Sequence, residues 1–189
     1  MKPRMLGRFL MTAVLLSGAG LAVAGTGPQA PAPNSDAAVV KAVRHQILMY
    51  PYYGVWDDVR FQVNEGRVTL QGAVTQPYKK SDIEKAVQRV PGVTSVSDRV
   101  KILPLSSMDD RLRLRLVRAI YGDPTLSRYA LNAQPPIRII VDNGHVTLEG
   151  VVRTKMEKDV AGLRAASAGL SFGPIINNLQ VEVPSGKKS

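Results

Sequence analysis

One ten-residue pattern occurs twice in the chain. Residues 63–72 read Val-Asn-Glu-Gly-Arg-Val-Thr-Leu-Gln-Gly, and residues 141–150 read Val-Asp-Asn-Gly-His-Val-Thr-Leu-Glu-Gly. Each copy places a glycine-containing turn between two runs of alternating apolar residues, which is typical of a β-hairpin. The copies lie 78 residues apart, whereas the repeats of solenoid proteins are about 20–50 residues long. The chain is therefore predicted to hold two related domains.

The apolar pattern around each hairpin predicts the order helix, strand, strand, helix, strand. A helix cannot bury its apolar stripe alone, so we expect both helices of each domain to cover one face of a three-stranded sheet. The hairpin is antiparallel, and a right-handed crossover makes the last two strands parallel, so the sheet is mixed. The predicted fold class is an α/β (α+β) sandwich built from two tandem α-β-β-α-β units. The last helix is expected to bury the stripe Met156, Val160, Leu163 and Leu170, and a final strand is expected over residues 175–183.

The first 24 residues have the features of an export signal. Lys2, Arg4 and Arg8 precede an apolar segment, and small residues at 22–24 suit cleavage before residue 25. A membrane-spanning helix needs about 20 apolar residues, and this segment is shorter; retention as an N-terminal anchor is the alternative. The chain has no cysteine, so we expect neither disulfides nor a lipoprotein anchor. The prediction is a soluble periplasmic protein.

Composition divides the rest of the chain. Residues 25–34 are rich in Pro, Gly and Ala and predict a flexible tether. The two domains are assigned to residues 35–104 and 105–184, followed by a basic tail at 185–189. The net charge of the whole chain is +10, but it is spread evenly over both domains. Such a distribution favours loose attraction to anionic surfaces and predicts no nucleic-acid partner.

The repeated hairpin and the strands that close each domain resemble the BON domain, a family named for bacterial osmotic-stress and nodulation proteins. The residues that carry the resemblance are 64–72 with 96–100, and 142–150 with 175–179. Asp98 and Asp142 depart from the asparagines usual in the family. The resemblance implies a mixed-sheet α/β sandwich, export to the cell envelope, a role in envelope maintenance or osmotic-stress response, and no enzymatic activity. It also implies binding of phospholipid surfaces or of envelope proteins.

The first helix of the second domain is the strongest candidate site. Its face opposite the predicted core combines apolar residues with arginines, which suits a helix lying on an anionic membrane surface. A phospholipid-binding member of the family uses the corresponding helix. The alternative is that Leu114 and Tyr121 pack against the first domain. The predicted lipid-binding residues are Arg111, Arg113, Leu114, Val117, Arg118 and Tyr121.

The aromatic run at residues 50–56 is a second candidate. Tyr52, Tyr53 and Trp56 have apolar bodies and polar tips, and so suit a membrane interface. The alternative is that this run covers the core of the first domain or packs between the domains. Asp57 and Asp58 follow it, but no third oxygen ligand at a suitable spacing accompanies them, so we expect no metal.

The sequence offers little to a catalytic mechanism. His45 and His145 are the two histidines, they fall in different domains, and neither belongs to a nucleophile or metal-ligand pattern. We therefore expect no enzyme activity and no cofactor. The predicted partner is an anionic phospholipid surface, bound peripherally. The alternative is a protein-interaction or chaperone-like module for exported proteins.

Overall fold

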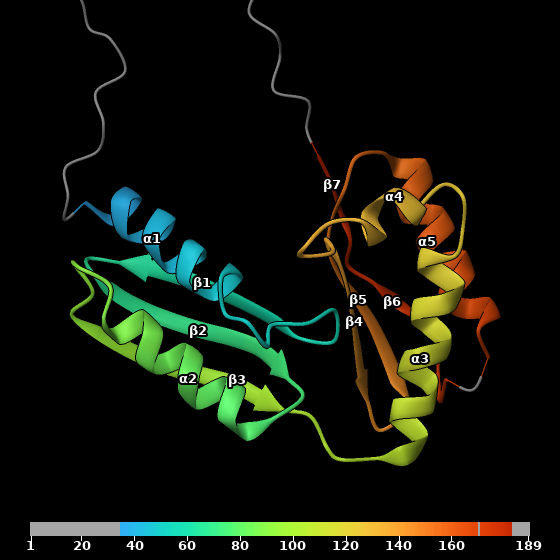
Figure 1. Ribbon diagram of the computed structural model, residues 1–189, viewed down its shortest axis with the longest axis horizontal. Coiled ribbons are helices and arrows are strands. Elements are labelled where there is room, and N and C mark those ends of the chain that lie inside the picture. The colour runs from blue at the N-terminus through green and yellow to red at the C-terminus, as the bar shows by residue number, and fades with distance from the viewer. Residues whose placement is uncertain (1–34, 170, 183–189) are drawn as a thin grey trace, which may run out of the picture. The chain divides into compact units, whose positions relative to one another are not determined.

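The computed structural model describes residues 35–169 and 171–182 (Figure 1). The predicted signal segment, tether and basic tail therefore lie outside the described residues. Within the described part, two α/β units follow one another along the chain, and the apolar side chains form two separate core clusters. No helix of that part is long and apolar enough to cross a bilayer.

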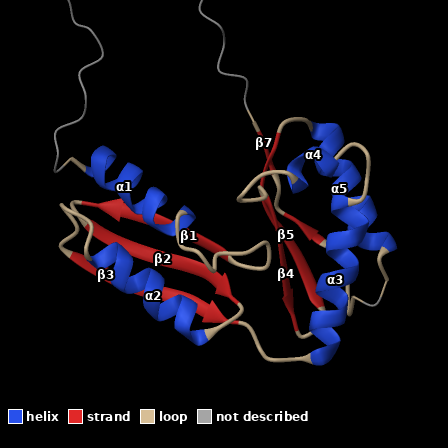
Figure 2. Cartoon of the chain, in the orientation of Figure 1, coloured by secondary structure: helices blue, strands red, loops and turns tan. Residues whose placement is uncertain are grey.

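The first unit is the three-stranded sandwich that the sequence predicts. It comprises α1 (Asp36–Leu48), β1 (Asp58–Asn64), β2 (Arg67–Val74), α2 (Pro77–Gln88) and β3 (Ser95–Ile102). The strand order is β1-β2-β3, with β1 antiparallel and β3 parallel to the central β2. Figure 2 shows both helices on one face of this sheet. That face buries side chains from all five elements, among them Val43, Leu70, Ile83 and Val100.

The second unit repeats this plan with one addition. It comprises α3 (Ser107–Tyr121), α4 (Ser127–Ala130), β4 (Ile137–Asp142), β5 (His145–Val152), α5 (Lys155–Ser167), β6 (Ile176–Asn177) and β7 (Gln180–Val181). The short helix α4 occupies the longer connection before β4. The predicted final strand is interrupted, because β6 and β7 each pair in parallel with β5. Between them Asn178 still donates its backbone N–H to the Leu148 carbonyl, at 2.9 Å.

The buried side of α5 differs from the prediction. Met156 and Leu163 are 64% and 69% exposed, whereas Ala161 and Ala165 are buried. The reason lies at the start of the helix, where the Thr154 side chain and a Glu157 carboxylate form a reciprocal capping box. Glu157 is buried, and this fixes which face of the helix turns toward the core.

The repeated hairpin owes its sequence to backbone geometry. Glu65 and Gly66 have φ values of 51° and 74°, in the left-handed region that tight hairpin turns require. The Asp36 carboxylate, in the first turn of α1, accepts the backbone N–H groups of both residues at 2.8 and 3.0 Å. Asp109 of α3 binds the turn at residues 143–144 in the same way, at 2.9 Å each. The motif therefore fastens each hairpin to its first helix.

Candidate functional site

The helix α3 begins with a side-chain cap and buries one apolar stripe. Ser106 accepts the backbone N–H of Asp109, and the acidic residues of the first turn favour the positive end of the helix dipole. Leu112, Leu116 and Ile120 are buried in the core of the second domain. Their spacing of four residues places them on one side, so the opposite side of α3 is the candidate membrane-binding face.

Three arginines form an exposed row on that side. Arg111, Arg115 and Arg118 are exposed and recur at the i, i+4, i+7 spacing of one helical face. Among the described residues, none of their guanidinium groups has a hydrogen-bond or ion-pair partner. Leu114 lies among them and is 45% exposed, as is Met108, six residues earlier on the same helix. We call Met108, Arg111, Leu114, Arg115 and Arg118 the α3 face.

Arg115 and Met108 were not among the residues predicted from the sequence. Arg115 follows Leu114 directly and lies on the flank of the helix that is nearer the buried stripe, so a helical wheel does not place it at the centre of the opposite face. Its long side chain can nevertheless reach solvent while its methylene groups cover apolar surface.

Arg113 lies on α3 but points into the protein. It is 5% exposed, and its Nη2 donates to the carbonyl of Val141 in β4 at 2.7 Å. Its Nη1 donates to the Asp110 carboxylate, also at 2.7 Å. The guanidinium is therefore engaged in holding α3 to β4.

Val117 and Tyr121 are half-buried against the core of the second domain. The Tyr121 hydroxyl donates to the Ile137 carbonyl at 2.5 Å, and burial raises its pKa above the ordinary value. The structure thus separates the six predicted residues into two groups. Arg111, Leu114 and Arg118 face solvent, whereas Arg113 and Tyr121 bond to β4 and Val117 packs against the core of the second domain.

The aromatic run is also divided between packed and exposed residues. Tyr53 is buried, its hydroxyl accepts the Val59 backbone N–H at 2.9 Å, and burial raises its pKa to about 12. The Arg138 guanidinium lies 4.6 Å from the centre of the Tyr53 ring. Trp56 is half-buried against the core of the second domain. Of the three predicted interfacial aromatics, Tyr52 alone is exposed, at 63%.

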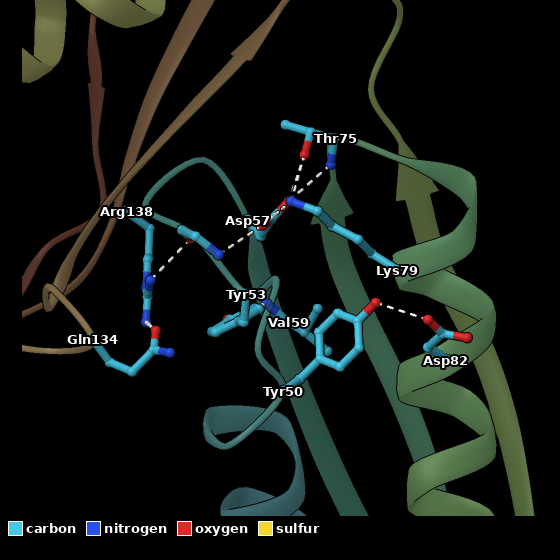
Figure 3. Close-up of polar contacts among 10 residues, drawn as sticks. Tyr50, Tyr53, Asp57, Val59, Thr75, Lys79, Asp82, Gln134 and Arg138 are labelled. Atoms are coloured by element: carbon cyan, nitrogen blue, oxygen red, sulfur yellow. Dashed lines mark hydrogen bonds and ion pairs between the residues drawn. The ribbon is translucent and has the colours of Figure 1, made fainter.

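Asp57, at the end of this run, holds a buried polar cluster. Its carboxylate is fully buried and accepts the backbone N–H groups of Gly54 and Thr75 at 2.8 and 2.9 Å. The Lys79 ammonium lies 2.7 Å from the same carboxylate (Figure 3). A lysine of α2 thus supplies the positive charge that this carboxylate requires in the interior.

The neighbouring carboxyl of Asp58 is also mostly buried. Burial raises its pKa above the ordinary value, an effect that the nearby Arg60 opposes. In the described part of the chain, no three His, Cys, Asp or Glu side chains cluster in a way that could hold a metal ion.

Comparison with known proteins gives a family match and remote similarities to solved structures, two of which are described below. The model of the BON domain family, described as "BON domain", matches residues 35–104 and 125–182. The C-terminal domain of CdsD, described as the structural protein of the type III secretion system of Chlamydia trachomatis, is 18% identical with a TM-score of 0.30. The match covers 76% of this chain and 64% of that one. A second CdsD structure is 15% identical with a TM-score of 0.29, covering 75% and 91%. No curated protein sequence matches the chain.

Proposed function

Because the chain belongs to the BON domain family, we propose that it is a non-enzymatic protein of the cell envelope that binds anionic phospholipid surfaces peripherally. The α3 face is the proposed contact. The observation that carries the proposal is its row of exposed arginines, which have no partners among the described residues and surround a half-exposed leucine. We place the protein in the periplasm, with a role in envelope maintenance or osmotic-stress response.

The chemistry of the α3 face suits the interfacial region of a bilayer. Basic side chains near an anionic membrane surface contribute about 1 kcal/mol each, and Arg111, Arg115 and Arg118 can approach phosphates together. Full burial of one large apolar side chain contributes about 1.5–3 kcal/mol, and half of the Leu114 surface is already buried in the free protein. The electrostatic part therefore dominates, and binding should be weak, reversible and sensitive to salt.

Co-sedimentation with vesicles tests this proposal. The vesicles contain either phosphatidylcholine alone or phosphatidylcholine with phosphatidylglycerol, over a range of salt concentrations. We expect binding to the anionic vesicles that weakens as salt rises. Arg118→Glu should weaken it about tenfold or more, because it removes one attractive charge and adds a repulsive one. Leu114→Asp should also weaken it.

Two matched variants serve as controls. Arg99→Glu makes the same charge change on the exposed side of β3, and Leu131→Asp makes the same apolar-to-acidic change at a residue that is 88% exposed. Both should bind almost as the wild type does. Wild-type binding by both Arg118→Glu and Leu114→Asp would exclude the α3 face as the lipid contact.

A further inference from the structure

The two domains treat the free edge of their sheets differently. In an antiparallel pair, alternate residues direct their backbone N–H and C=O groups away from the partner strand. In β4 these outward residues are Ile137, Ile139 and Val141. One outward group of each has a partner: the Tyr121 hydroxyl donates to the Ile137 carbonyl, Arg113 donates to the Val141 carbonyl, and the Ile139 N–H donates to the carbonyl of Val55, a residue of the first domain, at 2.9 Å.

The chain itself therefore closes the edge of β4. Val55 and Trp56, which precede β1, pack against the core of the second domain. An apolar segment from outside the second domain thus lies at this edge. One of its carbonyls bonds to the strand.

The first domain has the same edge without these partners. The buried residues Val39, Val43 and Ile47 of α1 match Leu112, Leu116 and Ile120 of α3, so Val40 and Leu48 stand where α3 has Arg113 and Tyr121. Neither side chain can donate a hydrogen bond. Val59 of β1 donates to the Tyr53 hydroxyl. For the outward groups of the next two positions, Phe61 and Val63, the described residues supply no partner.

A groove lies beside this open edge. It has a volume of about 660 Å³, and its lining includes Val40, Ile47 and Leu48 of α1 and Phe61 and Val63 of β1. The lining is mainly apolar, and Leu48 is 40% exposed. Arg44 also lines the groove, and its guanidinium has no ion-pair partner among the described residues.

The geometry points to a peptide-binding site at which β1 accepts an added strand. The occupant is an extended segment of a partner protein, with apolar side chains on alternate residues and an acidic side chain that faces Arg44. Unpaired N–H and C=O groups at Phe61 and Val63 offer the backbone bonds of strand addition, and the groove receives the alternate side chains. Arg44 determines the charge of the occupant.

A labelled heptapeptide provides the test. The probe is fluorescein-Thr-Val-Thr-Val-Thr-Asp-Thr, which places two valines and the aspartate on one side of a strand, and its binding to the chain is followed by fluorescence anisotropy. The double variant Val40→Arg/Leu48→Tyr introduces the residue types that close the β4 edge in the second domain. It should bind the peptide at least tenfold more weakly.

The matched control is Gln46→Arg/His45→Tyr. It introduces the same residue types, with the same change in charge, at exposed positions of α1 that do not line the groove. It should bind as the wild type does. Circular dichroism melting of both double variants shows whether they fold, and a second variant, Arg44→Glu, should reverse the preference toward a peptide with lysine in place of aspartate.

The outcomes are distinct. Loss of binding in Val40→Arg/Leu48→Tyr, reversal of charge preference by Arg44→Glu, and weaker binding of a peptide N-methylated on its β1-facing side would support the site. No saturable binding of the heptapeptide, or equal binding by Val40→Arg/Leu48→Tyr and its control, would overturn it. Self-association that Val40→Arg/Leu48→Tyr abolishes, without peptide binding, would also overturn it and assign the groove to a second copy of the chain.

Discussion

The two domains share one fold, but different side chains hold the segment that connects the first helix of each domain to its first strand. Each has a carboxylate at the start of its first helix that binds the hairpin turn. In the first domain the segment before β1 is held by the buried Asp57–Lys79 pair. In the second, the position equivalent to Lys79 is Glu157, whose carboxylate accepts the Tyr129 hydroxyl at 2.9 Å and pairs with Arg128. Both domains thus bury a charged residue at the start of their second helix, but the charge is positive in the first domain and negative in the second.

This difference shows which features the fold itself requires. The hairpin glycines and their aspartates are the same in both copies because the backbone geometry is the same. The buried charge can change sign because its partner, on the preceding connection, changes with it. Within the described part of the chain, the surface of each copy differs as well: α3 presents arginines without partners, whereas the edge strand beside α1 has backbone groups without partners.

The largest expected effect comes from breaking the buried pair of the first domain. Lys79→Met keeps most of the length of the side chain but leaves the buried Asp57 carboxylate without its counter-charge. Removing one member of a buried pair typically costs about 3–5 kcal/mol, so the free energy of unfolding should fall by that order. Urea unfolding measures the loss, and hydrogen exchange assigns it to the amides of β2 rather than β5.

Lys85→Met on the same helix is the control, because Lys85 is exposed and such substitutions usually change stability by less than about 0.5 kcal/mol. An equal, small effect of both variants would show that the ammonium of Lys79 is not needed to stabilise Asp57.

A smaller effect distinguishes the two roles of the arginines on α3. Arg113→Ala removes the donor to the Val141 carbonyl and leaves that buried group unsatisfied, which costs about 1–3 kcal/mol. Arg111→Ala removes an exposed side chain without a partner and should leave the free energy of unfolding almost unchanged. We expect the opposite order for vesicle binding: when equal amounts of folded protein are compared, Arg111→Ala should lose more binding than Arg113→Ala.

Both measurements use the same preparations, so each variant controls the other. If Arg111→Ala destabilised the protein as much as Arg113→Ala, the division of α3 into a packed side and an exposed side would be wrong.

The sequence predicts the fold well because two of its signals reinforce each other. The duplicated hairpin establishes the order of the elements, and the family resemblance indicates the same mixed sheet, which the structure confirms. The strand order was not predictable, since periodicity shows which face of a strand is buried and not which strand is its neighbour. The buried face of α5 was predicted wrongly, because Met156 and Leu163 are larger and more apolar than the alanines that pack there.

The candidate site was predictable only in part. Arg111, Leu114 and Arg118 follow from the helical wheel of α3, but the wheel cannot show that β4 offers Arg113 a carbonyl and Tyr121 another. Likewise, the open groove beside β1 depends on the lack of a side-chain hydrogen-bond donor at Val40 and Leu48, where the second domain has Arg113 and Tyr121. That difference becomes visible only when the two domains are compared in space.

The smallest expected effect is one of pH, and it also separates the domains. The Arg164 hydrogen bond, with the Thr125 backbone N–H, holds the pKa of Asp123 below its ordinary value, about 3.9 for an unperturbed aspartate. The folded state therefore favours the carboxylate, and this contribution is complete above that value and lost as the pH falls through the lower folded pKa. In the first domain, Tyr50 donates to Asp82 at the equivalent connection. Burial and the hydrogen bond to Asp82 raise the pKa of Tyr50, so the folded state favours the protonated hydroxyl. The resulting contribution to stability is complete below the ordinary tyrosine pKa of about 10 and is lost as the pH rises through the folded pKa.

Falling pH should thus reduce the stability that the Asp123–Arg164 contact contributes to the second domain. Rising pH should reduce the stability that the Tyr50–Asp82 contact contributes to the first domain. Urea unfolding of the wild type and of Arg164→Ala at pH 2.5 to 5 measures the acid side, with Arg153→Ala as a control at an exposed arginine of the same domain. Arg164→Ala should lower stability at pH 5 and show a shallower decline toward pH 2.5, because its Asp123 titrates closer to the unfolded value. A decline as steep as that of the wild type would mean that Arg164 does not determine the protonation of Asp123. The acid sensitivity of the second domain would then have to arise from other carboxylates.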